Sequence, residues 1–170
     1  MENKHGVVKM KNIILEQFAA SYDEDNWFVC VKNAISGLTA SQAAWKPERA
    51  DNSIWEILSH LNFYNFGYLE RYKGVDYIYP VHDNDATFIS GEAEEAWQAE
   101  AAKFDAIMTE FRTLIEAADE SKLSEPVSKT RTDTWDSLIS HIVSHNAHHG
   151  GQIVLIRKLQ GSWDPAKGVS

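Results

Sequence analysis

The sequence predicts an all-α protein, a single four-helix bundle domain formed by residues 1–170. Apolar residues recur at intervals of three and four over four long segments, as in helices that bury one face. The connections between these segments are rich in turn-forming residues, and no segment shows the alternating pattern of a strand. A chain of 170 residues is close to the usual size of one domain, so we expect one core and no second folding unit.

The first helix is expected over residues 12–37. It ends at a glycine, and its apolar stripe consists of Ile14, Leu15, Phe18, Tyr22, Val29 and Ile35. Residues 38–52 contain a proline and several turn-forming residues, which predicts a connector with at most a short turn of helix. The second helix is expected over residues 53–74, because Ser53 and Glu56 form a capping box in which each side chain accepts a hydrogen bond from the other residue's backbone amide.

The last two helices are expected over residues 92–118 and 133–161. Glutamates near the start of the third helix favour the positive end of its dipole, and Asp133 or Thr134 can cap the fourth helix, which ends at a glycine. The link of residues 75–91 contains a proline, a glycine and an Asp-Asn cluster, so it breaks the helical pattern. It is long enough to cross the bundle, which would let the second and third helices run parallel.

Histidines are concentrated on the fourth expected helix. His145 and His149 are four residues apart, so their imidazoles lie one turn apart on the same side and can reach one metal ion. At about 100° per residue they fall at the centre of a sector that we expect to be buried. The same sector holds Leu138, His141, Ile142, Gln152, Ile156 and Leu159. A buried imidazole without partners costs about 1–3 kcal/mol, so we interpret the pair as metal ligands rather than as core histidines.

Three other histidines have weaker grounds for ligation. His60 lies at the edge of the apolar stripe of the second helix and can face the interior, but a single histidine in such a position is weak evidence for a ligand. His141, one turn before His145, fits a core residue or one that supports a ligand, and His148 fits a partly exposed flank position. The residues alone therefore leave the third ligand open.

These motifs resemble those of a known family. The segments IWEILSHLNFYN and HNAHHGGQI are similar to the DinB/YfiT-like superfamily of metalloenzymes, whose pattern is one histidine in the second helix and H-x-x-x-H-x-G-Q in the fourth. The resemblance extends from the first helix to the terminal LIRKLQG. It implies an up-down-down-up bundle with a three-histidine metal site, in which His60 joins His145 and His149. Homodimers are common in this family, so the resemblance also favours a homodimer.

Four positions near these ligands bear on function. Family members commonly have Arg between the last ligand and the Gly-Gln pair, where this chain has Gly150, so whatever that arginine binds or orients is absent. Gln152 matches the family's glutamine; we expect it to face the core and either to support the bound cofactor or only to pack the helix. Glu56 and Tyr64 are candidate catalytic residues, although capping explains Glu56 and core packing explains Tyr64 equally well.

Three neutral imidazoles leave at least one coordination position of a metal for water or substrate. Such a site supports hydrolysis of a small molecule or transfer of a low-molecular-weight thiol to an electrophile, and the family resemblance implies both activities, in stress response or detoxification. We expect zinc or nickel, although three imidazoles also suit copper or iron. The alternative is a non-catalytic protein in which the ion only stabilises the bundle.

Charge and composition disfavour other classes of function. The net charge is −9 and the basic residues are scattered, which opposes binding to nucleic acid and to an anionic membrane surface. The single cysteine, Cys30, permits no intrachain disulfide, so the metal ligands must be nitrogen or oxygen atoms. The sequence has neither a signal peptide nor an apolar run of about 18 residues, so we expect a cytoplasmic protein.

Overall fold

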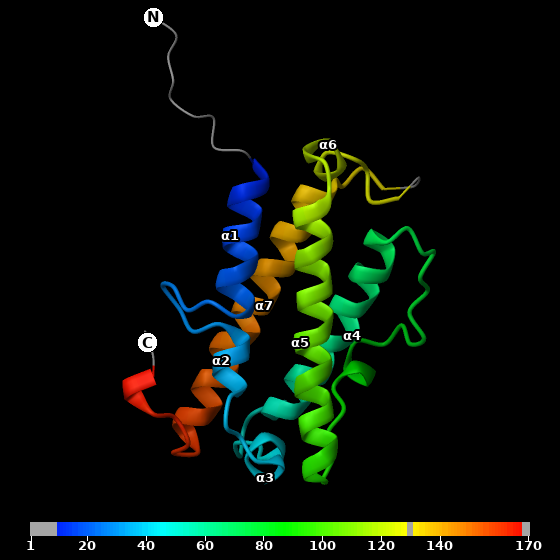
Figure 1. Cartoon of the computed structure of the whole chain (residues 1–170). Coiled ribbons are helices and arrows are strands. Elements are labelled where there is room, and N and C mark those ends of the chain that lie inside the picture. The colour runs from blue at the N-terminus through cyan, green and yellow to red at the C-terminus, as the bar shows by residue number, and fades with distance from the viewer. Residues whose placement is uncertain (1–9, 129–130, 168–170) are drawn as a thin grey trace, which may run out of the picture.

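The computed structural model describes residues 10–128 and 131–167, and these residues form helices and connections without a strand (Figure 1). The four long helices are α1 (Met10–Tyr22), α4 (Ile54–Tyr72), α5 (Glu94–Ala117) and α7 (Trp135–Leu159). The connections contain the short helices α2 (Val31–Ile35), α3 (Ala40–Ala44) and α6 (Glu120–Leu123) and the 3-10 helices η1 (Asp85–Thr87) and η2 (Pro165–Lys167). The expected all-α fold is confirmed. Within the described ranges, no helix combines the length and the apolar character needed to cross a membrane.

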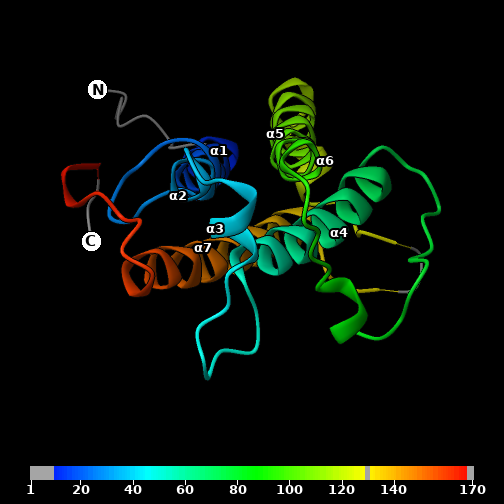
Figure 2. The same cartoon turned by 90° about the horizontal axis from the view of Figure 1, so that it is seen from below.

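The helices α4 and α5 run in the same direction and rise from the same end of the bundle (Figure 1). At that end the rings of Trp55 and Trp97 lie 5.4 Å apart. The helix α7 runs opposite to α4. The end of α4 lies beside the start of α7, where the rings of Tyr72 and Trp135 are 4.9 Å apart. The link between α4 and α5 lies on the outer side of α4, away from α1 (Figure 2).

The start and the end of α4 are as predicted from the sequence. Ser53 Oγ accepts a hydrogen bond from the Glu56 amide (3.2 Å), and Glu56 Oε2 accepts one from the Ser53 amide (2.6 Å). Gly74 follows the last turn with a φ of +87°, a conformation that glycine adopts without steric cost. These local signals fix the helix that carries His60.

The expected continuous helix over residues 12–37 is wrong. The helix α1 ends at Tyr22, and α2 begins only at Val31. Between them the Asp25 carboxylate accepts a hydrogen bond from the Cys30 amide (2.9 Å), a bond from side chain to backbone that competes with helical bonds. Val29 and Cys30 of this loop are buried, as are the apolar residues of α1, so the apolar spacing continues across the break and does not reveal it.

A buried pair of asparagines holds α4 against α7. Asn65 Nδ2 donates to Asn146 Oδ1 (3.0 Å), and both side chains are fully buried. Asn146 Nδ2 also contacts the sulfur of Met108 on α5 (3.8 Å). Because Asn65 follows His60 by little more than one turn and Asn146 follows His145 directly, this pair sets the level at which the two histidines face each other.

Candidate metal centre

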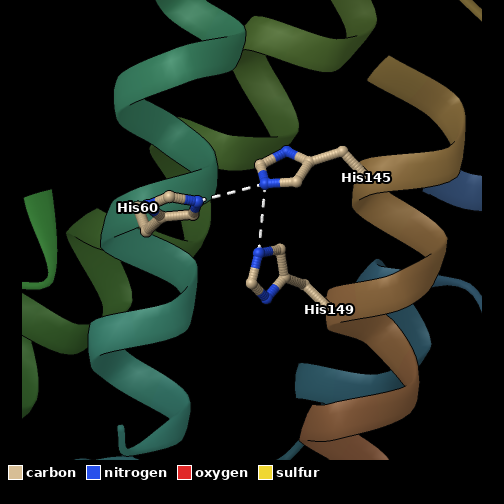
Figure 3. Close-up of side chains that lie close together, drawn as sticks. All are labelled: His60, His145 and His149. Carbon is tan, nitrogen blue, oxygen red and sulfur yellow. Dashed lines mark hydrogen bonds between the residues drawn. The ribbon is translucent and has the colours of Figure 1, made fainter. Parts of the chain in front are cut away.

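Three histidines from two helices meet between α4 and α7 (Figure 3). The Nε2 atom of His145 lies 3.1 Å from Nε2 of His60 and 3.1 Å from Nε2 of His149. The three ligand atoms all lie within 4.8 Å of one another. Around a tetrahedral ion with bonds of about 2.0–2.1 Å, neighbouring ligand atoms are separated by roughly 3.3 Å. The three predicted ligands are therefore brought together in a group that could hold one metal ion.

The proton on His60 is fixed by η1. Thr87 Oγ1 donates its only proton to the carbonyl oxygen of Asn84 (2.6 Å), so it can only accept from Nδ1 of His60, 2.7 Å away. His60 therefore carries its proton on Nδ1 and directs the lone pair of Nε2 toward His145. Phe88 stacks on the His60 ring, with centroids 4.2 Å apart and planes 12° from parallel. The hydrogen bond and the stacking together hold the orientation of this ring.

Gln152 acts on His149 in the same way. Gln152 Oε1 lies 2.6 Å from His149 Nδ1 and accepts its proton, which leaves the Nε2 lone pair directed at His145. The amide nitrogen of Gln152 donates to Nε2 of His148 (3.2 Å), so this amide orientation satisfies both neighbours. Gln152 thus positions a predicted ligand and does not itself join the three-histidine group.

Burial keeps the three imidazoles neutral. Burial, together with the neighbouring imidazoles, lowers the pKa of His60 to about 3 and that of His145 to about 4, and burial also lowers the pKa of His149. The two lone pairs of His60 and His149 face His145, whose Nε2 can donate at most one proton. A divalent cation accepts all three lone pairs at once, so the donor set fits a metal ion better than it fits hydrogen bonding alone.

The three histidines lie in the wall of a cavity of about 480 Å³ between α4 and α7. From α4, Tyr64 and Tyr68 continue the line of His60 on successive turns, and Asn84 and Phe88 come from the link after α4. The Tyr64 hydroxyl donates to Asn84 Oδ1 (3.2 Å). From α7 the cavity is lined, besides the ligands, by His141, Ile142 and His148. Within the described part of the chain, no carboxylate, ammonium or guanidinium group lines this cavity.

The comparison with known families agrees with this geometry. Residues 31–153 match the family model of the DinB superfamily, a span that is more than half of the chain and contains all three histidines. The chain belongs to the DinB superfamily. No curated protein matches the chain. The family resemblance indicated by the histidine motifs is confirmed.

The two candidate catalytic residues of this DinB-superfamily protein have different surroundings. Tyr64 lines the cavity one turn from His60. Glu56 does not line the cavity; it caps α4 and pairs with Lys46 (2.9 Å). Burial raises the pKa of Glu56, but the hydrogen bonds from Ser53 and Lys46 outweigh burial and lower it below its ordinary value. The structure therefore brings Tyr64, and not Glu56, to the histidines.

The expected buried sector of α7 is only partly correct. Its buried members are Leu138, Ile142, His149 and Ile156. His145 is half-buried, whereas the exposed members are His141, Gln152 and Leu159. The expectation that Gln152 faces the core is therefore wrong. His141 borders the open cavity of the histidines, whereas Gln152 and Leu159 border a second hollow farther along α7. Fully buried residues such as Ile139 and Ile153 lie on the neighbouring side of the helix.

Three residues of the site were not identified from the sequence: Asn84, Thr87 and Phe88. They belong to the link of residues 75–91, whose sequence predicts only a break between two helices. Its length was the available signal, because links longer than about 12–15 residues are uncommon and often functional. The sequence gives no indication that this link folds back onto His60.

Gly150 lies buried where α7 packs against the start of α2. A Cβ atom at this position would lie 3.4 Å from Val31 Cγ2 and 3.6 Å from the carbonyl oxygen of Val29. A methyl group is tolerated at such distances, but an arginine side chain would have to displace α2. In this DinB-superfamily protein the local packing therefore favours a small residue at position 150.

Proposed function

We propose that this protein is a metal-dependent enzyme that acts on a small molecule, with one zinc or nickel ion held by His60, His145 and His149. One observation carries the proposal: the three Nε2 atoms converge at the wall of a cavity of about 480 Å³. An ion there would have part of its coordination sphere facing a space that is large enough for a small molecule.

When bound, a divalent ion on three neutral imidazoles supplies a Lewis-acid position that activates either water for hydrolysis or a low-molecular-weight thiol for transfer to an electrophile. The chain supplies the rest. Thr87 and Gln152 hold two ligand rings in one tautomer each. Tyr64 lines the cavity and would contact a bound substrate, whereas Glu56 serves as the cap of α4. Either activity would suit detoxification during stress.

The proposal is tested on the full chain, purified without chelators and then loaded with cobalt in place of the native metal. A ligand that enters the coordination sphere should change the visible spectrum of the cobalt site, and His145→Ala serves as the control that lacks this site. Candidate esters, amides and thiols with electrophiles are then assayed for turnover. A spectrum that no thiol or substrate changes, together with no turnover, would favour a non-catalytic metal-binding protein.

A further inference from the structure

We infer that the ligand of the metal cavity has one metal-binding head and an uncharged body that contains a flat ring. This inference rests on the proposed function, because the head requires the metal site. It concerns the part of the ligand that lies beyond the metal, and it is drawn from the walls of the cavity.

The α4 wall of the cavity is a row of rings that begins at the metal site. His60, Tyr64 and Tyr68 occupy successive turns of α4, and all three line the cavity. The His60 and Tyr64 ring centroids lie 4.9 Å apart, and those of Tyr64 and Tyr68 lie 6.5 Å apart with planes 27° from parallel. Eight residues of α-helix rise about 12 Å, which is enough for a body of one or two rings. Aromatic rings contact flat apolar groups well, so this wall favours a ring-containing body.

The other walls add apolar surface and contain no lysine, arginine, aspartate or glutamate side chain among the described lining residues. Ile142 on α7 and Phe88 from the link after α4 contribute apolar side chains to the cavity. Asn84 is the only amide among the lining residues, and its Oδ1 already accepts a proton from the Tyr64 hydroxyl. A ligand body in this cavity therefore meets rings and one branched aliphatic group. Its polar partners are Asn84, the tyrosine hydroxyls and the imidazoles of His141 and His148, which carry no permanent charge.

The cations near the outer end of the ring row have partners of their own. Burial raises the pKa of Tyr68, and the nearby charges of Arg71 and Arg131 oppose this rise. The Arg71 guanidinium donates to the carbonyl oxygen of Tyr77 (3.3 Å) and lies 4.7 Å from the centre of the Tyr79 ring. Arg131 pairs with the carboxylate of Asp133. A carboxylate or phosphate on the ligand body would lose water in the cavity, where no lysine or arginine side chain is among the described lining residues, and this loss disfavours it.

Gly150, the residue after His149, also offers no positive charge to an anionic ligand. Gly150 is packed against α2, so no guanidinium is present there to pair with an anionic ligand. The whole chain also carries a net charge of −9, which repels anions at a distance. A thiolate head offsets one of the two positive charges of the metal, and because no lysine or arginine of the described ranges lines the cavity, the body should be neutral.

Two matched thiols test the inference on the full-length, cobalt-loaded protein. The probes are 4-methylbenzenethiol and 4-mercaptobenzoate, which share a ring and a thiol but differ in the charge at the far end. Both are titrated at a pH at which both thiols are ionised, and binding is followed by the cobalt spectrum. We expect 4-methylbenzenethiol to bind at least about tenfold more tightly.

A pair of variants on α4 tests the contribution of the ring row. Tyr68→Leu should weaken the binding of 4-methylbenzenethiol about 3- to 10-fold without changing the cobalt content. Phe66→Leu is the matched control, because Phe66 packs on Tyr77 and does not line the cavity. Circular dichroism of both variants confirms that α4 is intact.

The possible outcomes separate this inference from the proposed function. If 4-mercaptobenzoate binds cobalt-loaded protein as tightly as 4-methylbenzenethiol, the inference is overturned while the metal site stands. Unchanged binding of 4-methylbenzenethiol to a folded Tyr68→Leu variant would also overturn it. If the protein binds no cobalt, or if its cobalt spectrum responds to neither thiol, the proposed function fails and the inference fails with it.

Discussion

Replacing Thr87 with valine should weaken metal binding although Thr87 contacts no metal. The two side chains have nearly the same shape, and Thr87 is only 2% exposed, so the substitution removes a hydroxyl with little change in packing. The lost hydroxyl is the acceptor for the proton on Nδ1 of His60. His60 is itself 3% exposed, so water cannot easily replace that acceptor.

The size of the effect follows from the two states of His60. With Nε2 bound to an ion, the proton must remain on Nδ1, where it would be buried without a partner at a cost of about 1–3 kcal/mol. Without an ion, the proton can move to Nε2 and be donated to His145, 3.1 Å away, so most of this cost falls on the metal-bound state. At about 1.4 kcal/mol for each tenfold change, zinc affinity should fall roughly 5- to 150-fold. Loss of a group that orients a metal ligand typically weakens metal binding by about 10- to 100-fold.

Zinc affinity of Thr87→Val is measured by competition with a coloured chelator. Thr87→Ser keeps the hydroxyl and should bind zinc almost as tightly as the wild type. Thr113→Val is a second control, because the Thr113 hydroxyl donates to the carbonyl oxygen of Thr109 within α5, on the exposed surface. A folded Thr87→Val variant with wild-type zinc affinity would refute the role assigned to η1.

Three other predictions concern residues of α4 and α7. Gln152→Ala should lower zinc affinity in the same competition assay, but less than Thr87→Val does, because Gln152 is exposed and water can replace its amide oxygen; a larger loss would contradict this ranking. Burial lowers the pKa of His60 to about 3 from 6.5, so the unfolded chain binds more protons between these values. The free energy of unfolding of metal-free protein should therefore fall as the pH drops below about 6.5, and His60→Gln should reduce this fall in urea titrations; an identical pH dependence would count against a buried neutral imidazole. Gly150→Ala should stabilise α7 by about 0.5–1 kcal/mol, whereas Gly150→Arg should lower the melting temperature because its side chain meets Val31, and equal melting temperatures would contradict that packing.

Local signals in the sequence were sufficient where one residue determines the backbone. The capping box of Ser53 and Glu56 and the glycine at position 74 define α4 almost to the residue. The spacing of His145 and His149 correctly placed both side chains on one side of α7. Such signals depend on neighbours within a few residues, which is why the sequence alone reveals them.

Features that depend on distant contacts were not predictable in this way. The break after Tyr22 depends on Asp25 bonding the Cys30 amide, and the apolar spacing gives no sign of it. Which side of α7 is buried and which borders a hollow depends on the packing of the neighbouring elements, so the exposure of Gln152 could not be derived from its position on one helix. The contact between Thr87 and His60 joins residues 27 positions apart through an irregular link, for which periodicity has no meaning.

The metal content of the purified full chain tests the central claim most directly. Elemental analysis after purification without chelators should find one divalent transition metal ion per chain in the wild type and in His148→Ala, and none in folded His145→Ala or His149→Ala. Wild-type protein without metal, or equal loss in all three variants, would contradict a site formed by His60, His145 and His149.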